Sequence, residues 1–114
     1  MHETSLCRSL LARVLEIARH HDAAAVATIR LRLGPLGRLD PQHIIEDFIH
    51  IAHGTPAQEA RIEIETAALQ IHCPACGMES EAAPDDPSCR RCGSDDTRIL
   101  NGAELVLLNV ELAV

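Results

Sequence analysis

The stretch CPACGMESEAAPDDPSCRRCG, residues 73–93, decides the fold prediction because it contains four of the five cysteines of the chain. These cysteines form two C-x-x-C pairs, and a glycine directly follows each pair. Such spacing is typical of a zinc site with four thiolate ligands, here Cys73, Cys76, Cys89 and Cys92. Because protein atoms fill all four positions, no position is open to water or substrate, and we expect a structural Zn(II).

Two other chemistries fit the same cysteine pattern. Disulfides are rare in a reducing compartment, and we expect a cytoplasmic protein because Glu3 and Arg8 interrupt any export signal at the start of the chain. An iron site of the rubredoxin type uses the same four ligands and stays open as an alternative. The fifth cysteine, Cys7, lies on the apolar side of a predicted helix and is expected to be a small core residue.

The segment between the first and last cysteine of the site has almost no hydrophobic residues beyond Met78 and a few alanines, and three prolines interrupt it. It cannot bury a core of its own. Zinc binding in comparable peptides contributes roughly 10 to 16 kcal/mol, which is enough to fold such a segment. The sequence therefore predicts a zinc module over residues 73–98, inserted into a body made of residues 1–72 and 99–114.

Hydrophobic periodicity on both sides of the module predicts the elements of that body. The residues Asp40 and Pro41 mark the start of a helix, and Leu69 and Ile71 extend an alternating strand up to the first cysteine. The expected class is α+β, with two helices on one face of a small three-stranded sheet and an inserted zinc-ribbon-like module. The predicted elements are a helix to about His20, strands over 24–33, 60–66 and 106–112, and a helix over 41–52.

The first three residues, Met1, His2 and Glu3, form a possible chelating group. Methionine is usually retained before a bulky residue, so the free amine belongs to Met1. This amine, the deprotonated backbone nitrogen of His2 and its imidazole place nitrogen donors in one plane, which suits Ni(II) and Cu(II). Glu3 can complete the site. Taken alone, a histidine at position 2 is more often part of a solvated tail.

Histidines also occur at metal-binding spacings on the second predicted helix. Residues three or four positions apart share a helix face. We expect these residues to form a solvated face and not a metal site. The two possible sets are His43, Asp47 and His50, and Glu46, His50 and His53.

Composition excludes several classes of function. The 114 residues are 46% hydrophobic and 24% charged, which is typical of one globular domain with a small appendage. A net charge of −7 and a single aromatic residue, Phe48, argue against nucleic-acid binding. No apolar run is long enough to span a membrane, and neither HExxH nor a nucleotide-binding loop is present, so we expect no enzyme activity. The main alternative is a zinc-ribbon module for protein interaction or nucleic-acid binding.

Four segments together resemble the HypA/HybF family of hydrogenase maturation nickel metallochaperones. They are MHETSLC at the start, HGTPAQEARIEIE over 53–65, the CPACG and CRRCG pairs, and NGAELVLLNVEL over 101–112. Two stretches depart from the family pattern: LGPLGRLD over 33–40, and a second helix with fewer aromatic residues. Neither touches an expected ligand.

The resemblance implies a nickel site formed by the Met1 amine, His2 and Glu3, and a zinc site formed by the four paired cysteines. It also implies delivery of Ni(II) to the large subunit of nickel-iron hydrogenase with a GTPase partner, and in some organisms to urease. No nucleic acid or membrane is expected to bind. The chain is expected to be a monomer or a homodimer.

Overall fold

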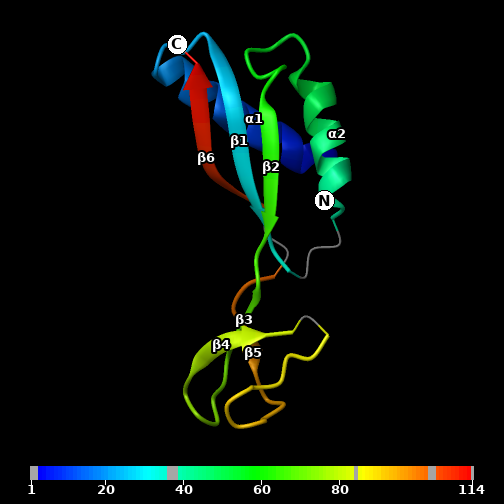
Figure 1. The fold of residues 1–114 in the computed structure, drawn as a ribbon, viewed down its shortest axis with the longest axis vertical. Coiled ribbons are helices and arrows are strands. Elements are labelled where there is room, and N and C mark those ends of the chain that lie inside the picture. The colour runs from blue at the N-terminus through cyan, green and yellow to red at the C-terminus, as the bar shows by residue number, and fades with distance from the viewer. Residues whose placement is uncertain (1–2, 36–38, 84, 103–104, 114) are drawn as a thin grey trace. The chain divides into compact units, whose positions relative to one another are not determined.

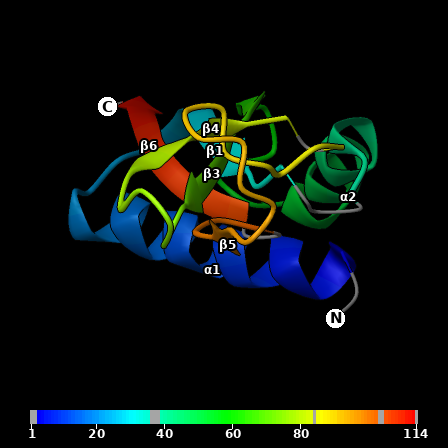
Figure 2. The same ribbon diagram turned by 90° about the horizontal axis from the view of Figure 1, so that it is seen from below.

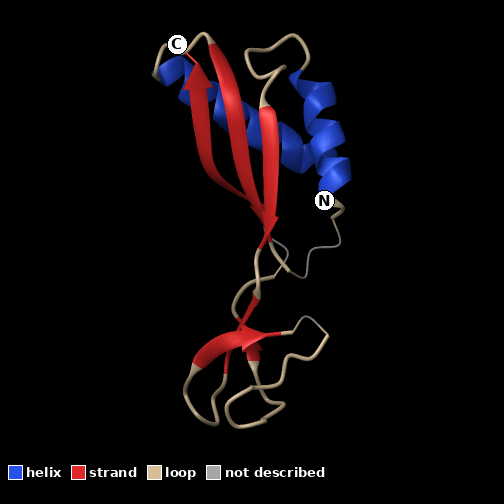
Figure 3. Ribbon diagram, in the orientation of Figure 1, coloured by secondary structure: helices blue, strands red, loops and turns tan. Residues whose placement is uncertain are grey.

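The computed structural model describes residues 3–35, 39–83, 85–102 and 105–113. These residues form two compact units. The first comprises Met1–Arg32, Leu39–Glu65 and Leu105–Val114, and the second comprises Leu33–Arg38 and Thr66–Glu104. The elements, shown in Figures 1 and 3, are α1 (Glu3–His20), β1 (Ala25–Leu33), α2 (Pro41–Ala52), β2 (Arg61–Thr66), β3 (Leu69–His72), β4 (Glu79–Ala82), β5 (Arg98–Ile99) and β6 (Leu105–Ala113).

The first unit contains a mixed three-stranded sheet in the order β2-β1-β6. Strands β1 and β2 run in the same direction, and β6 runs in the opposite direction (Figure 1). The backbone N–H of Ala24, just before β1, donates to the carbonyl oxygen of Ala113 at the end of β6 over 3.0 Å, as expected for antiparallel strands. Parallel strands need a crossover connection, and α2 supplies it. The predicted three-stranded sheet is confirmed.

The two helices of the first unit pack together against this sheet. Asp40 caps α2, because its side chain accepts a hydrogen bond of 3.0 Å from the backbone N–H of Gln42. Figures 1 and 2 show α1 crossing one face of the sheet with α2 beside it. Cys7 is fully buried, which confirms its predicted place in the core. The core is formed mainly by Cys7, Leu11, Val14, Ala18, Ile29, Leu31, Ile44, Phe48 and Ala52.

The second unit contains an antiparallel sheet in the order β4-β3-β5. Leu69 pairs with Ala82 of β4, and Ile71 pairs with Ile99 of β5. The expectation that Leu69 and Ile71 extend the strand of residues 60–66 is therefore wrong. The strand β2 ends at Thr66, and β3 begins a different sheet three residues later. Alternation alone could not reveal this change, because apolar and polar residues alternate in both segments.

A small core holds the second unit together. It consists of Leu69, Ile71, Cys73, Ala82 and Cys89, and each of these residues is at most 6% exposed. The two large aliphatic residues come from β3, before the first cysteine, and not from the cysteine segment itself. The compact unit is consequently wider than the predicted module of residues 73–98.

Candidate metal centre

The second unit brings the four predicted zinc ligands together. The four Sγ atoms all lie within 4.8 Å of one another. The Sγ atoms of Cys73 and Cys92 are 3.5 Å apart, and those of Cys76 and Cys89 are 3.8 Å apart. A tetrahedron with zinc–sulfur bonds of about 2.3 Å has sulfur–sulfur edges of about 3.8 Å. The cluster therefore has the size of a four-thiolate metal site.

Two turns with the same hydrogen bonds position the sulfur atoms. The N–H of Gly77 donates to the carbonyl oxygen of Cys73, and the N–H of Gly93 donates to that of Cys89, both over 2.7 Å. The N–H groups of Cys73 and Cys89 each donate over 2.9 Å to a carbonyl oxygen five residues further along the chain. The φ angles of Gly77 and Gly93 are 74° and 77°, a left-handed conformation that favours glycine. Each turn thus directs two thiols to one point.

The four thiols differ in burial. Cys73 and Cys89, which open the two turns, are 0% and 1% exposed, whereas Cys76 and Cys92 are exposed. Each turn therefore contributes one sulfur from the small core and one from the surface. An ion held by all four would be anchored to the core of the unit on one side and closed off by the two outer cysteines on the other.

The surroundings of Cys89 and Cys92 shift the pKa values of these two thiols in opposite directions. Backbone N–H groups of Cys92 and Arg91 lower the pKa of Cys89 to about 6, because they stabilise its thiolate. The Ser94 backbone lowers the pKa of Cys92, but the Cys73 thiol, burial and the remaining thiols outweigh it and raise this pKa to about 11. The backbone N–H groups thus favour the thiolate at Cys89, whereas burial and the neighbouring thiols favour the neutral thiol at Cys92.

The predicted nickel ligands fall largely outside the structural description. Met1 and His2 lie outside the described residues, and so does the side chain of Glu3. The described backbone begins with α1 at Glu3, so the proposed ligands directly precede or begin this helix. Their role in nickel binding stays a prediction.

The histidines of α2 do not form a second metal site within the described residues. In that part of the chain, the four cysteines are the only group of three or more potential ligands that lie close enough to share an ion. His43, His50 and His53 are exposed. This agrees with the expectation that this helix presents a solvated face.

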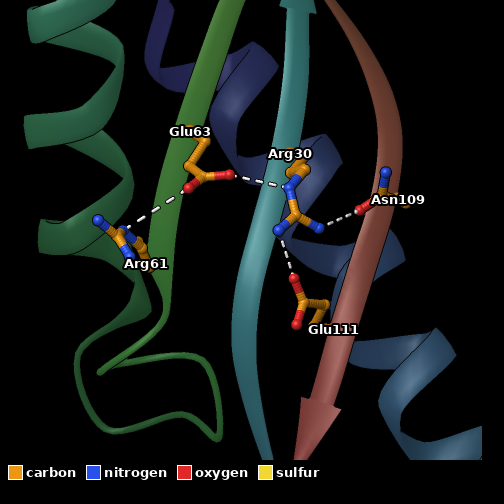
Figure 4. Close-up of polar contacts among 5 residues, drawn as sticks. All are labelled: Arg30, Arg61, Glu63, Asn109 and Glu111. Atoms are coloured by element: carbon orange, nitrogen blue, oxygen red, sulfur yellow. Dashed lines mark hydrogen bonds and ion pairs between the residues drawn. The ribbon is translucent and has the colours of Figure 1, made fainter.

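A polar network on the open face of the first sheet was missed by the sequence reasoning (Figure 4). Arg30 of β1 donates through Nε to Oε1 of Glu63 on β2 over 2.8 Å, and through Nη1 to Oδ1 of Asn109 on β6 over 2.9 Å. A third contact joins Arg30 Nη2 to Glu111 on β6. Glu111 and Glu63 together raise the pKa of Arg30. One guanidinium therefore links all three strands.

A sequence signal for this network did exist. Arg30 and Arg32 alternate on one strand, and Glu63 and Glu65 alternate with the same spacing on another. Parallel pairing places the two sets side by side, and Arg32 lies 2.8 Å from Glu65. The signal could be read only after the parallel order of β1 and β2 was known.

Comparison with known proteins decides the family. A family model described as "Hydrogenase/urease nickel incorporation, metallochaperone, hypA" matches residues 1–112. The chain belongs to the HypA family. This confirms the resemblance inferred from the sequence. The HypA family is described as a metallochaperone, a protein that carries a metal and is not an enzyme, in agreement with our expectation.

Individual HypA proteins resemble the whole chain. A protein named hydrogenase maturation factor HypA from Nitrosospira multiformis is 38% identical over 112 residues, covering 98% of this chain and 97% of the relative. A protein of the same name from Aquifex aeolicus is 34% identical and covers 100% of this chain and 99% of the relative. Both similarities include the cysteine module and the residues around it.

Solved HypA structures share the fold. The solution structure of the nickel metallochaperone HypA from Helicobacter pylori has a TM-score of 0.73 and 24% identity, covering 99% of this chain and 98% of that chain. A second solution structure of a HypA protein has a TM-score of 0.78 at 24% identity. At this level of identity the likeness concerns the fold.

No helix in the described part of the chain is long and apolar enough to cross a membrane.

Proposed function

We propose that this HypA protein binds Ni(II) at its N-terminus and delivers it during the maturation of nickel-iron hydrogenase, and in some settings of urease. The Met1 amine, His2 and Glu3 are the proposed nickel ligands. The observation that carries the proposal is the match of the nickel incorporation family to residues 1–112, which includes these three residues. Planar nitrogen donors suit Ni(II), which supports this ligand set.

Zn(II) is the proposed resident metal of Cys73, Cys76, Cys89 and Cys92. The donor set supports this choice, because four thiolates at tetrahedral spacing are typical of structural zinc sites. The ion would hold together a unit whose small core, among the described residues, includes the two large aliphatic side chains of β3. Because protein atoms fill all four positions, the zinc would have no position for nickel exchange or for a substrate.

The two proposed metals belong to different compact units. Glu3 is part of the first unit, and the four cysteines are part of the second. We infer that the first unit is the nickel-binding body and that the second unit, which contains the predicted module of residues 73–98, depends on zinc. This division makes the two metals separately testable.

Nickel delivery requires acceptors outside this chain. We propose a nickel-insertion GTPase and the large subunit of nickel-iron hydrogenase as its partners, acting in the cytoplasm. A reducing compartment suits a site that depends on four reduced thiols. Addition of nickel-loaded protein and the GTPase to nickel-free hydrogenase large subunit should raise its nickel content. Transfer that is equally fast with free Ni(II) at the same concentration would contradict a carrier role.

The test of the nickel site is metal stoichiometry in untagged protein. His2→Ala should abolish Ni(II) binding, measured by equilibrium dialysis and elemental analysis, while zinc content stays unchanged. His21→Ala is the matched control, because His21 is exposed and lies just beyond the other end of α1. Nickel retained in His2→Ala at the wild-type level would overturn the proposed ligand set.

A complementary variant tests the zinc site. Cys92→Ser removes one exposed ligand without creating a cavity in the small core. It should lower zinc content sharply and leave nickel binding intact. Ser88→Ala changes a half-buried position of the same unit that is not a ligand, and it should keep its zinc. Loss of nickel together with zinc in Cys92→Ser would contradict the proposed division between the two sites.

A further inference from the structure

The side chain of Asn101 continues the sheet of the second unit beyond the end of β5. This short strand ends at Ile99 and pairs with β3 through two residues. The backbone N–H of Leu100 then donates to the carbonyl oxygen of Gln70 on β3 over 2.8 Å. Asn101 comes next, and at this point a side-chain amide takes the place of a backbone strand.

The amide of Asn101 makes two hydrogen bonds with the chain at the start of β3. Its Oδ1 accepts from the backbone N–H of Gln70, and its Nδ2 donates to the carbonyl oxygen of Ala68, each over 2.8 Å. The amide thus uses both its acceptor and its donor, as a peptide group does between strands. A carboxylate in its place could keep the first bond but not the second, because it has no hydrogen to donate.

The residue that follows makes this amide chemically reactive. Asn101 precedes Gly102, whereas the only other asparagine of the sequence, Asn109, precedes the β-branched Val110. The backbone nitrogen of the next residue can attack the side-chain amide of an asparagine. Glycine hinders this approach least because it has no Cβ atom, and a β-branched residue hinders it strongly.

We propose that Asn101 is a site of spontaneous deamidation, and that its two hydrogen bonds to residues 68 and 70 hold the reaction back while the second unit is folded. The backbone nitrogen of Gly102 forms a bond to Cγ of Asn101 and gives up its proton. The side-chain nitrogen takes this proton and leaves as ammonia. One water molecule then opens the resulting succinimide ring at either carbonyl carbon, which yields aspartate or isoaspartate.

Both hydrogen bonds oppose the first step of this reaction. Attack makes the planar Cγ of Asn101 tetrahedral, so Oδ1 and Nδ2 cannot keep the positions in which they meet their partners. The bond from Nδ2 must also break before ammonia can leave. Deamidation therefore starts from the fraction of molecules in which this segment has opened locally. The stability of the second unit consequently sets the rate.

Deamidation would separate the segment around Asn101 from β3. In the aspartate product an oxygen replaces Nδ2 and faces the carbonyl oxygen of Ala68, so two acceptors meet where a donor and an acceptor had met. In the isoaspartate product the backbone passes through the former side chain and is longer by one atom. Either product adds a negative charge. The change is covalent, so it persists when the unit closes again.

Peptide mapping by mass spectrometry tests the site in the full-length, zinc-loaded protein. Samples are incubated in a reducing buffer with and without guanidinium chloride. We expect conversion at Asn101 and not at Asn109, at least about tenfold faster in the denaturant. Gly102→Ala should stay largely unconverted in both, and an added Cβ atom meets nothing within 4 Å there. An Asn101 that stays intact in the denaturant would overturn the site, and equal rates would overturn its protection.

A matched pair of core variants tests whether opening of the second unit controls the rate. Ile71 of β3 and Ile29 of β1 are both fully buried. Ile71→Val should raise the rate of deamidation without denaturant by about threefold or more, together with the hydrogen exchange of the Gln70 N–H. Ile29→Val, in the first unit, should change neither. Equal acceleration by the two variants would show that global unfolding, and not this segment, controls the reaction.

Asn101→Asp copies one product and tests its effect. The hydrogen exchange of the Leu100 N–H, followed by NMR, should become about tenfold faster. Asn109→Asp is the matched control, because it adds the same charge and its carboxylate can still accept the hydrogen bond from Arg30. An exchange rate in Asn101→Asp equal to that of the control would overturn the proposed effect. Nickel takes no part in these assays, so their outcome is independent of the proposed carrier function.

Discussion

The Sγ atoms of Cys73 and Cys92 lie 3.5 Å apart although 19 positions separate these residues. This contact, like that of 3.8 Å between Cys76 and Cys89, joins one C-x-x-C pair to the other. A metal ion held by both pairs would close the loop between them. It would lower the conformational entropy of the unfolded chain and stabilise the folded unit. We therefore expect the second unit to depend on a bound metal for its stability.

Gly77→Ala should weaken zinc binding. The φ angle of Gly77 is 74°, and a residue with a Cβ atom pays roughly 1–2 kcal/mol for the left-handed conformation. Competition with a chelator should show a lower zinc affinity by about tenfold. Gly102→Ala is the control, since an added Cβ atom meets nothing within 4 Å there and no left-handed φ is needed. An unchanged affinity in Gly77→Ala would mean that the turn adapts to alanine.

Zinc affinity should fall as the pH is lowered. The centre contains thiols whose pKa is raised, Cys76 and Cys92, the latter to about 11. These thiols release protons when they bind zinc, so acid competes with the metal. Because at least two protons are released, the affinity should drop by at least about a hundredfold per pH unit near neutrality. Chelator titrations at several pH values measure the slope, and a flat profile would contradict four-thiolate ligation.

Nickel affinity should also fall as the pH is lowered, over a range set by the terminal amine and the His2 imidazole. The terminal amine has a pKa of about 7.7 to 8.0 and the imidazole of about 6.5. Both the Met1 amine and His2 must be neutral to bind Ni(II). Calorimetric titration should therefore show weaker binding at pH 5.5 than at pH 7.5 by more than about tenfold. Acetylation of the terminal amine should abolish the difference together with the binding.

Phe48→Ala should strongly destabilise the first unit. The Phe48 side chain on α2 is fully buried, and removal of a buried phenylalanine costs about 3–5 kcal/mol. Urea unfolding followed by far-UV circular dichroism measures the loss. Ile49→Ala on the same helix should change stability by less than about 0.5 kcal/mol, because its side chain is 54% exposed. Equal losses in the two variants would place the core elsewhere.

Arg30→Met should lower stability in a salt-dependent way. It keeps much of the aliphatic stem but removes the contacts with Glu63, Asn109 and Glu111. The ion pairs are partly exposed, so salt screens them. The difference in melting temperature from the wild type should shrink between 0.05 and about 1 M NaCl. Arg61→Met provides the control, because Arg61 makes one longer contact of 3.6 Å with Glu63. A salt-independent difference would show that packing dominates.

Much of this molecule could be predicted from sequence, for identifiable reasons. Zinc ligands in C-x-x-C pairs are local motifs, and the periodic spacing of Ile44 and Phe48 defines a helix face without any tertiary information. Strand partners are not local. An alternating pattern shows that a segment is a strand, but it does not show which strand is its neighbour. The sequence therefore did not show that β1 and β2 pair, or that Leu69 belongs to another sheet than Ile64.

The position of β6 beside β1 has a consequence for biosynthesis. The second strand neighbour of β1 is encoded about seventy residues after it, beyond the whole cysteine unit. On the ribosome, the first sheet cannot be completed until residues 105–113 have been made. During that interval the nascent chain exposes one side of β1. A metal ion captured early by the cysteines would shorten the loop that β6 must close, so zinc supply during translation should influence the yield of folded protein.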